Sequence, residues 1–557
     1  MTAQSGSANI DVAGYQQAEQ FSGLISKLTT AGINKNIEYR SRVQNIEVAA
    51  NTAVKAQQVK FTADKGSVVV AGKVIADAKD ASKIELFAAD EIILKEGAEL
   101  SAKTLSAEQG GTVLLSSTDS DLDGLSGIDI QAGSSIDVGD ATGKHGEVVL
   151  RALRTDSDGN GVEDSINITQ LAGNVTGYAG RTVSKVENGS VTHYKEGNRF
   201  YAEGVKIYQD SNGQITSADI NQYRTDASNY MSNTNRLKVS ADLQQDLQLR
   251  PGVEVQYDCN LSLNSDLNTV DWRYASLLDG VNSEGVQEKY DATVGQVALR
   301  ASGDLLLNKS ISDGFKDGAI NVDTVIEFFG QFFPISESIQ VKDKLQSGNS
   351  WSFNLVAGAD LNSADTTAVN EAGDITIASN VKVRTGSGDI KLTAAGDVNF
   401  TSQTSVLYNA GRPDVVSPYG SLSDTIVGFN FYSEYPVSGG DIDIKAGGDV
   451  NGAKSTQFIN NWLLRQGKWS AGSDHANDVP TAWGIGLGYT PTKSTNAAFA
   501  RKSLFEQNIG SFGGGHVTVV AQGDISDLSI MMPTTGKQVG TPDPDSPLGF
   551  LTNVVEI

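Results

Sequence analysis

Alternation of apolar and polar residues, interrupted by glycine, recurs along most of this chain. It is clearest in four segments that share one template: GQVALRASGDL (295–305), GDIKLTAAGDV (388–398), GDIDIKAGGDV (440–450) and GHVTVVAQGDI (515–525). In the second segment, Ile390, Leu392 and Ala394 occupy every second position, and Val398 resumes the apolar series after the glycine. A period of two is typical of a strand with one buried face.

A glycine followed by an aspartate separates the two apolar runs of each segment. We expect the glycine to supply the backbone freedom for a sharp corner, and the aspartate to cap that corner. These glycines are Gly303, Gly396, Gly448 and Gly523. Each segment is therefore predicted to be strand, corner, strand. One such unit cannot bury its apolar face alone, so the copies are predicted to stack as a solenoid.

The distribution of this pattern divides the chain into parts. We assign an N-terminal segment with a short helix to 1–50, a first β-helical part to 51–153, an Asp-rich excursion with a hairpin and a helix to 154–236, a second β-helical part to 237–530, and a C-terminal strap or linker to 531–557. The second β-helical part carries three excursions of its own, at about 309–348, 404–436 and 453–511. We expect the strands of both parts to form one continuous rod.

Local signals place two helices and a hairpin outside the strand pattern. A helical pattern around Phe21 and Ile25 ends at Gly32, and a second helix is predicted from Ser217. The segment 187–189, Glu-Asn-Gly, predicts a hairpin turn. The phenylalanines of 325–333 recur at helical spacing, which predicts a satellite helix packed on the solenoid or an exposed partner patch.

Composition narrows the class of function. The 557 residues include 43 basic and 67 acidic ones, a net charge of −24, which argues against nucleic acid as a partner because phosphate binding needs a basic surface. A single cysteine, Cys259, excludes an intramolecular disulfide. The sequence contains no apolar run near the roughly 20 residues of a membrane span. The first residues lack signal-peptide features, so we expect either a cytosolic chain or an internal piece of a longer one.

Several ordered motifs resemble one family of exoproteins. They are GQVALRASGDLLLNKSISDGF, SWSFNLVAGADLNSA, VRTGSGDIKLTAAGDVNF with a later YNAG, NWLLRQG, and GGGHVTVVAQGDISDLSIMMPTTG. Together they are similar to the filamentous haemagglutinin family, and more narrowly to a region of uncharacterised function found in many members, over roughly 80–540. The resemblance implies an all-β fold, a right-handed parallel β-helix, and export by two-partner secretion through an outer-membrane partner. It also implies a role in adhesion, biofilm or cell contact. The family's secretion domain is absent from this sequence, and the Asp-rich loop near 156 is an insertion relative to its usual spacing.

The segment DSDGNGVED at 156–164 has the oxygen spacing of a calcium loop. Carboxylates or amides at positions 1, 3 and 5, a glycine at 6 and an acid at 9 can wrap one hard cation. The predicted metal ligands are Asp156, Asp158, Asn160, Val162 through its carbonyl, and Asp164. Position 12, usually glutamate, is Asn167, and the alternative is a solvated Asx-rich turn.

Two further loops carry weaker versions of this pattern. The loop that starts at Asp119 matches positions 1, 3, 5 and 6 but has Gly127 at position 9. The loop around Asp210 has Tyr208 at position 1, so we expect an ordinary turn followed by a helix capped by Ser217.

The corner aspartates and the aromatic residues of the excursions each allow two interpretations. The aspartates either form a carboxylate ladder for calcium or acid-base chemistry, or hydrogen-bond to backbone at the corners, which we expect. They are Asp304, Asp389, Asp397, Asp441, Asp449 and Asp524. The aromatics either stack on sugars or pin the excursions to the body, which we expect. They are Trp462, Trp469, Trp483, Phe429, Phe431, Tyr432 and Tyr435.

These features favour a non-enzymatic structural or adhesive segment of a large secreted bacterial surface protein, with no catalytic residue assigned. Its expected partners are a surface receptor or glycan on host or bacterial cells, with self-association as a further possibility. A stacked coil grows linearly with repeat number and tolerates long insertions on its flanks, which suits projection and contact. The alternatives are a polysaccharide-active β-helix enzyme and a self-assembling filament subunit.

Overall fold

The structure is a computed structural model of the chain. It describes residues 6–14, 18–106, 109–119, 125–156, 159–187, 190–196, 199–232, 247–275, 280–281, 287–328, 331–370, 372–413, 436–459, 462–468, 479–485, 505–533, 537–539 and 554–556.

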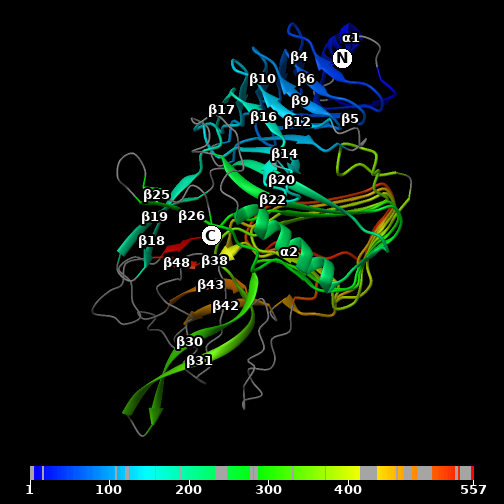
Figure 1. The fold of residues 1–557 in the computed structure, drawn as a ribbon. Coiled ribbons are helices and arrows are strands. Elements are labelled where there is room, and N and C mark those ends of the chain that lie inside the picture. Colours follow the sequence, from blue (N-terminus) through cyan, green and yellow to red (C-terminus); the bar gives the residue numbers. More distant parts are fainter. Residues whose placement is uncertain are drawn as a thin grey trace.

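One long parallel sheet runs through the whole molecule (Figure 1). Period-two burial places one face of its strands in the core, as the alternation predicts. We call it the long sheet, and its strands in spatial order are β1 (Gly6–Val12), β2 (Ile33–Ser41), β5 (Gln58–Ala63), β8 (Lys83–Ala88), β11 (Thr112–Ser117), β14 (Glu147–Thr155), β20 (Phe200–Gln209), β22 (Gln248–Tyr257), β27 (Gln296–Ala301), β32 (Ser352–Ala357), β35 (Ile390–Ala394), β40 (Ile442–Ala446) and β45 (Val517–Ala521).

Two shorter parallel sheets complete the coils in each half of the chain. In the N-terminal half one contains β3 (Ile46–Val48), β6 (Val68–Val70), β9 (Glu91–Leu94), β12 (Gly127–Ile130) and β16 (Ile168–Leu171), and the other β4 (Ala53–Lys55), β7 (Lys73–Ile75), β10 (Glu99–Ser101), β13 (Ser135–Asp137) and β17 (Asn174–Thr176). In the C-terminal half one contains β21 (Gln214–Ile215), β23 (Leu261–Leu263), β28 (Leu305–Leu307), β33 (Ile375–Ile377), β36 (Val398–Phe400), β41 (Val450–Asn451) and β46 (Ile525–Ser526), and the other β24 (Leu267–Asn268), β29 (Ile311–Ser312), β34 (Lys382–Thr385), β37 (Val406–Asn409), β44 (Ile509–Ser511) and β47 (Ile530–Met531). The predicted fold class, an all-β parallel β-helix, is confirmed.

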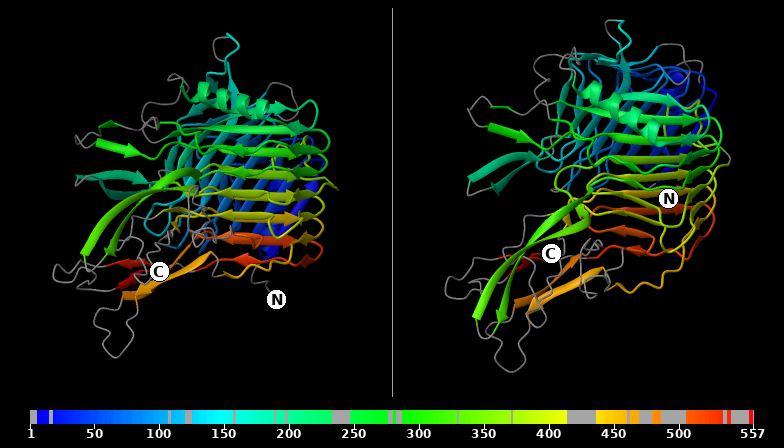
Figure 2. Two further views of the ribbon diagram at one scale, coloured as in Figure 1. Left: turned by 90° about the horizontal axis from the view of Figure 1, so that it is seen from below. Right: turned by 60° about the horizontal axis from the view of Figure 1, so that its bottom comes forward.

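The expectation of one continuous rod is wrong, because the two halves are separate coil stacks that share only the long sheet. Pairing through β20 and β22 aligns Leu153 of β14 with Val205, Gly252 and then Gln296, the first residue of β27. On β14, the last strand of the first stack, pairing with β20 begins at Val148, five residues before Leu153. The second stack is therefore displaced along the strands by roughly 16 Å at 3.3 Å per residue. Figure 2 shows the two stacks pointing in different directions.

The boundaries of the coils also differ from the predicted ones. The long sheet already includes β2, within the segment expected to precede the solenoid, and β20 lies inside the predicted excursion at 154–236. Strand β20 has the sequence FYAEGVKIYQ, whose alternation is masked by polar residues on both faces. The interruption of the coil strands is therefore shorter than the predicted excursion at 154–236.

Each stack has its own apolar core. The inward residues predicted from the template are fully buried in β35, β36, β40 and β41: Ile390, Leu392, Val398, Ile442, Ile444 and Val450 are all 0% exposed. Burial of each such side chain contributes about 1.5–3 kcal/mol, so the stacks are held chiefly by this series of aliphatic residues.

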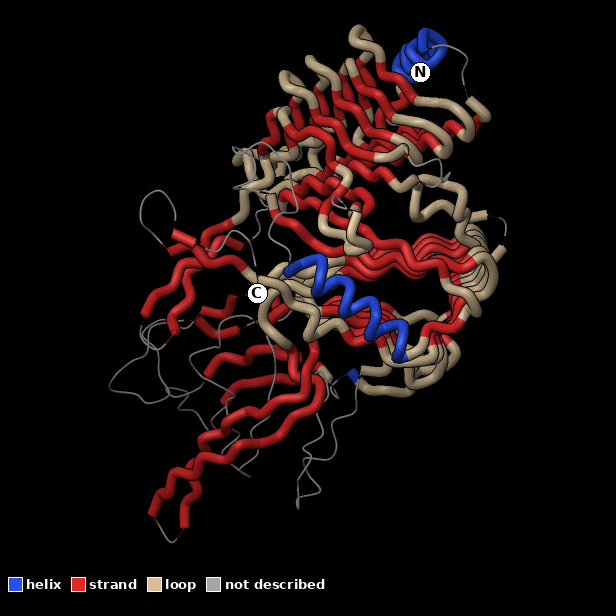
Figure 3. Tube along the Cα trace, viewed as in Figure 1, coloured by secondary structure: helices blue, strands red, loops and turns tan. Residues whose placement is uncertain are grey.

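Both predicted helices are present. Helix α1 (Ala18–Thr30) covers the N-terminal end of the first core with Phe21 and Ile25, which are 3% and 2% exposed. Helix α2 (Ser217–Ser232) lies where the stacks meet (Figure 3) and contributes Tyr230 to the first core and Tyr223 to the second.

The cap of α2 differs from the predicted one. The Thr216 carbonyl accepts the first helical bond from Ile220, and Asp219 accepts the Thr216 N–H at 2.8 Å. Thr216, rather than Ser217, is therefore the N-cap, because its carbonyl accepts the first helical bond while its N–H and its hydroxyl both donate to the Asp219 carboxylate.

A loop of the second stack also reaches back to the first. We call residues 358–373, between β32 and β33, the latch loop. Its contacts join Arg40 to Asp360 (2.5 Å), Asp64 to Ser363 (2.7 Å) and Lys60 to Asp365. All three partners lie on or just after β2 and β5, so the latch loop ties together coils that are some 300 residues apart in sequence.

The corner glycines serve a different purpose from the predicted one. Those at 303, 396, 448 and 523 do not have φ in the left-handed region. Instead, a Cβ on Gly448 would overlap the Asp397 carboxylate of the preceding coil, and the other three glycines face the equivalent side chain in the same way. Glycine is required here for close approach between coils rather than for a turn.

The aspartates form a ladder of side-chain-to-backbone hydrogen bonds between coils. Each carboxylate accepts the backbone N–H of the equivalent aspartate in the next coil, as Asp397 does from Asp449 at 2.7 Å. The series runs from Asn260 to Asp304, Asp374, Asp397, Asp449 and Asp524, with distances of 2.7–3.0 Å. A second, shorter series joins Asp389, Asp441 and His516. The backbone-bonding interpretation of these carboxylates is confirmed, although the bond is to the neighbouring coil.

This geometry predicts that the glycine and the aspartate of one rung are energetically coupled. The variant Gly448→Ala should destabilise the protein by about 1–3 kcal/mol, since the new methyl group displaces the Asp397 carboxylate. In an Asp397→Ala background the same change should cost much less. Asp397→Asn should be nearly neutral, since Asn260 makes the same bond in the first rung. Urea unfolding of the four variants in a double-mutant cycle measures the coupling, and additive effects would contradict the ladder.

Candidate functional site

Most of the excursions leave the solenoid at one corner, the turn that leads from the third strand of a coil into the long sheet. Excursions at this corner contain β18 (Arg181–Glu187) and β19 (Ser190–Glu196), β25 (Gly280–Val281) and β26 (Gln287–Tyr290), β30 (Phe315–Phe328) and β31 (Gln331–Leu345), and β38 (Arg412–Pro413) and β39 (Pro436–Val437). We call this row the hairpin edge. Figure 1 shows β18, β19, β30 and β31 extending from the same side of the body.

Excursions from different coils also pair with each other. Strand β19 pairs in parallel with β26 through Tyr194 and Lys289, which makes a four-stranded sheet, β18-β19-β26-β25, outside the solenoid. A further hairpin, β42 (Leu463–Lys468) with β43 (Val479–Ile485), leaves at a different corner, and β43 contacts β48 (Lys537–Val539), which pairs with β49 (Val554–Glu556). Within the hairpin edge, two excursions from different coils thus form one sheet.

The prediction of a helix at 325–333 is wrong. Strands β30 and β31 form a long antiparallel hairpin in which Phe328 pairs with Gln331 and Ile326 with Phe333. Phe328 thus lies on one strand and Phe332 and Phe333 on its partner, not on one helical face. Ile320, Val322 and Thr324 precede them in period-two alternation, which is the signal that the helical interpretation missed. The hairpin predicted at 187–189 is confirmed, since Glu187 pairs with Ser190.

An aromatic cluster anchors the bases of two hairpins to the C-terminal stack. Phe315 begins β30, and its ring lies 5.8 Å from that of Tyr408 in β37. Trp462, immediately before β42, is 1% exposed and lies 5.4 Å from Phe505 and 5.3 Å from Phe512. Trp462 therefore pins an excursion, as expected. The side chains of Trp469, Trp483, Phe429, Phe431, Tyr432 and Tyr435 lie outside the described part of the chain.

A partly buried ion pair fixes the base of the β30–β31 hairpin. Asp343 of β31 accepts hydrogen bonds from Arg384 at 2.5 Å and from Lys382 at 3.0 Å. Burial alone would raise the pKa of Asp343, but Arg384 and Lys382 lower it from 3.8 to about 2. The Arg384 guanidinium also lies 4.2 Å from the centre of the Phe315 ring, so the polar and aromatic parts of the base form one unit.

The predicted calcium loop follows β14 and precedes β15 (Ser165–Ile166). The Asp156 carboxylate accepts N–H groups of Gly159 at 2.8 Å and Gly161 at 2.6 Å, and Asn160 Oδ1 accepts from Val162 at 2.8 Å. The Asp156 carboxylate also accepts the Asn160 N–H at 3.2 Å, so backbone hydrogen bonds of the Asx-rich turn hold this loop. Asp158 lies outside the described residues. Within the described chain, no three acidic, histidine or cysteine side chains gather at one point, and calcium here stays a prediction.

The two weaker loops do not strengthen the calcium pattern. Of the loop at 119–124, Asp119 is described but residues 120–124 lie outside the described chain. At the other, the Asp210 carboxylate accepts N–H groups of Asn212 at 2.8 Å and Gly213 at 3.1 Å, which is the ordinary turn expected there.

A group of buried charges lies on the outer face of the long sheet where the two stacks meet. Glu254 bonds to Arg151 and, at 2.7 Å, to Arg300, and Glu203 bonds to Arg250 at 2.7 Å. Glu203 and Glu254 are each 1% exposed. Burial would raise the pKa of Glu254, but the two arginines lower it to about 2. Nothing in the sequence pattern places these residues together, because they come from β14, β20, β22 and β27.

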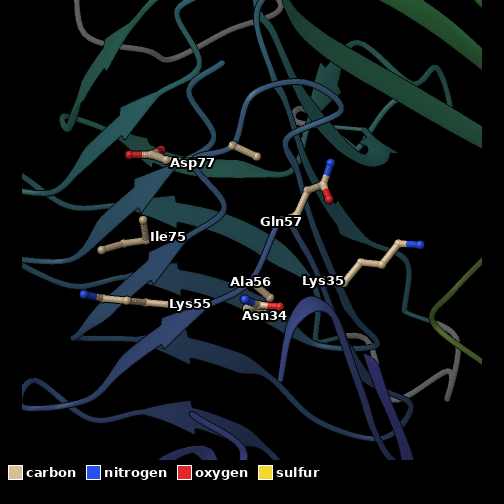
Figure 4. Close-up of a pocket in the computed structure, with 8 residues that line it drawn as sticks. Asn34, Lys35, Lys55, Ala56, Gln57, Ile75 and Asp77 are labelled. Atoms are coloured by element: carbon tan, nitrogen blue, oxygen red, sulfur yellow. The ribbon is translucent and has the colours of Figure 1, made fainter. Parts of the chain in front are cut away.

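A pocket of about 540 Å³ lies on the N-terminal stack beside β4, β5 and β7 (Figure 4). Lys35, Lys55, Gln57 and Asp77 contribute polar groups, but Lys35 and Lys55 point in opposite directions. Asp77 is bonded to Ser101 at 2.6 Å. The polar groups do not converge on one point, so this pocket lacks the arrangement of a specific ligand site.

Comparison of the chain with protein-family models, with curated proteins and with solved structures gives no match. No helix in the described part of the chain is long and apolar enough to cross a membrane.

The hairpin base should depend on Asp343. Replacement by Asn leaves the Arg384 and Lys382 charges without their carboxylate, and we expect a loss of about 1.5–3 kcal/mol, the range for hydrogen bonds to charged groups, because the pair is partly exposed. Hydrogen exchange of the β30 and β31 amides should report the loss. Asp271→Asn is the matched control, because its pair with Lys316 at 2.6 Å is about half exposed and should contribute less than about 1 kcal/mol.

The same pair predicts a pH dependence. Because the pKa of Asp343 is lowered to about 2, its contribution is complete above the ordinary value of 3.8 and is lost as the pH falls towards 2. The difference in hydrogen exchange between wild type and Asp343→Asn should therefore be constant from pH 7 to about 5 and shrink below about 4. A difference that grows on acidification would contradict this assignment.

Proposed function

We propose that this chain is a non-enzymatic structural and adhesive segment of a secreted bacterial surface protein, whose hairpin edge contacts a receptor or glycan on another surface. The observation that carries the proposal is that the excursions of the hairpin edge all leave the solenoid at a single corner. Because successive coils stack about 4.8 Å apart, elements that leave at one corner line up along one edge. A row of hairpins on a rigid body is an arrangement suited to surface contact.

The resemblance to the filamentous haemagglutinin family supports the same proposal. Its motifs include corner segments that now have a physical role: GDIKLTAAGDV and GDIDIKAGGDV contribute successive rungs of the aspartate ladder. Export by two-partner secretion, with an outer-membrane partner acting on the full-length protein, and a place at the cell surface or in biofilm follow from this resemblance.

The buried charges where the two stacks meet favour a structural role over polysaccharide cleavage. Glycoside hydrolysis requires two carboxyl groups facing the substrate, one of them a proton donor with a raised pKa. Glu203 and Glu254 are buried and bonded to arginines. Burial raises the pKa of Asp64, but this carboxyl is bonded to Arg40 at 2.6 Å and to Ser363 at 2.7 Å. These groups hold the two stacks together instead of facing a substrate.

Removal of one hairpin tests the adhesive proposal. Replacement of residues 319–342 with a short Asn-Gly turn should leave the circular dichroism spectrum and melting temperature of the solenoid nearly unchanged, because these residues lie beyond the buried base at Phe315 and Leu345. Binding to bacterial or host cells should fall. The matched control replaces 467–480, the tip of the β42–β43 hairpin, which leaves at another corner. Unchanged binding by the first variant, or cleavage of a glycan panel by the wild type, would overturn the proposal.

We also propose calcium binding at 156–164, with Asp156, Asp158, Asn160, Val162 and Asp164 as ligands. Titration calorimetry should show one binding event at or below millimolar calcium, and Asp156→Asn should weaken it while keeping an acceptor for the turn. Asp210→Asn, in a similar turn without the ligand spacing, should have no effect. Absence of heat at millimolar calcium would refute this assignment.

A further inference from the structure

The long sheet folds back on itself, so that the outer faces of the two stacks lie opposite each other. Strands β8 and β35 are seven strands apart in this sheet, which would separate them by about 34 Å if the sheet were flat. Burial lowers the pKa of Lys391 in β35, but nearby carboxylates, Glu85 of β8 among them, raise it above its ordinary value. The two charges can interact in this way only because the outer faces approach each other. The latch loop, which follows β32, crosses between these faces to β2 and β5.

The stacks are joined at β20 and β22, and each of these strands passes from the first core to the second at a glycine. Ala202 and Leu249 belong to the first core, and Val253 belongs to the second. Between them lie Gly204 in β20 and Gly252 in β22. Glycine gives a strand the freedom to change direction, and here it does so without moving a side chain that packs in either core. The junction therefore has the properties of a hinge.

The contact between the two outer faces is not an apolar core. Phe87 and Val356 point away from both cores and are buried, at 2% and 0% exposure, but neither joins a core cluster. Asn354 is 2% exposed, and its Oδ1 atom has no hydrogen-bond partner among the described residues. The bonds from the latch loop to Arg40 and Asp64 are polar. A contact of charged pairs and scattered apolar side chains is typical of parts that move relative to each other.

The coil that carries the latch loop does not need it. Gly358 and Gly373 lie side by side, since a Cβ on Gly373 would be 2.2 Å from the Gly358 nitrogen. A chain that joined Gly358 directly to Gly373 would have the corner Gly-Gly-Asp, which ends with Asp374. This corner has the length and the sequence of the regular corner at 447–449. Residues 359–372 are therefore an addition to a complete coil, and their contacts serve the relation between the stacks.

We propose that the latch loop is a clasp: it holds the two stacks together, and without its bonds they swing apart about the junction of β20 and β22. The loop acts far from this hinge, because β5 lies four strands from β20, about 19 Å. The bonds of Glu254 to Arg151 and Arg300 lie at the junction itself and restrain the motion with a shorter lever. Opening exposes the charged outer face of the long sheet, together with Phe87 and Val356. This inference does not depend on the adhesive function.

The distance between two spin labels on the full chain tests the clasp. The labels are attached to Glu47→Cys in the first stack and Lys454→Cys in the second, both exposed positions, in a Cys259→Ser background that removes the only native cysteine. Deletion of 359–372 should shift the distance between the labels to a longer and broader distribution. Hydrogen exchange of the β35 and β40 amides should stay as slow as in the wild type, because the corner of the coil is regenerated.

A point variant provides a second measurement that leaves the length of the loop unchanged. Asp365→Lys places a second cation beside Lys60 and should shift the label distance in the same direction as the deletion. Asn362→Lys is the matched control, since it adds a lysine to an exposed position of the same loop and should keep the wild-type distance.

Two outcomes would overturn the proposal. The first is a wild-type distance in both the deletion variant and Asp365→Lys, which would mean that the junction alone fixes the stacks. The second is an equal shift in Asp365→Lys and Asn362→Lys, which would mean that added charge rather than the loss of a bond moves the stacks. If the deletion also speeds exchange of the β35 amides, Asp365→Lys decides alone, and an unchanged distance in that variant refutes the clasp.

Discussion

The architecture depends on how closely one coil can approach the next. Backbone pairing sets the spacing of the stack, and the aspartate ladder adds one bond per coil at a fixed corner. That bond is possible only because the residue immediately before the donor aspartate is glycine. A Cβ at this position would overlap the accepting carboxylate of the preceding coil. In the C-terminal stack the corner between the long sheet and the next strand consequently keeps three residues in five coils: 258–260, 302–304, 395–397, 447–449 and 522–524. The corner has a fixed length in these five coils.

The latch loop is the instructive exception to this rule, because it is inserted into that same corner, between β32 and β33. Its ends are brought together at Gly358 and Gly373, and Ala359 bridges to Val369 inside the loop. The chain therefore returns to its starting point, and Asp374 still takes its place in the ladder between Asp304 and Asp397. An insertion is tolerated at this corner when its two ends meet in the space that two glycines provide. The protein uses the loop to bond one stack to the other.

The sequence predicted what depends on local periodicity and missed what depends on contacts between distant segments. Period-two alternation was sufficient for the strands, the inward residues and the fold class. The helical interpretation failed at 325–333, because phenylalanines of two paired strands recur there at helical spacing. The corner glycines were predicted, but the reason for glycine at these positions was not. A steric clash with a neighbouring coil cannot be inferred from the sequence of one segment. The displacement at β20 and β22, and the bonds from Arg40 and Asp64 to the latch loop, join residues that no motif relates.

The corners of a coil have different roles, which explains why the rigid solenoid can carry long excursions. The glycine–aspartate corner keeps the coils in register, so excursions at the corner before the long sheet do not disturb the ladder. Their bases are instead fixed by separate anchors: Phe315 and Tyr408 at the β30–β31 hairpin, and Asp343 with Arg384 beside them. Each hairpin can therefore change in length or sequence beyond its anchor without loss of core burial. The residues that hold a coil in register are therefore different from those of the excursions, which is the condition under which a solenoid can diversify its contacts.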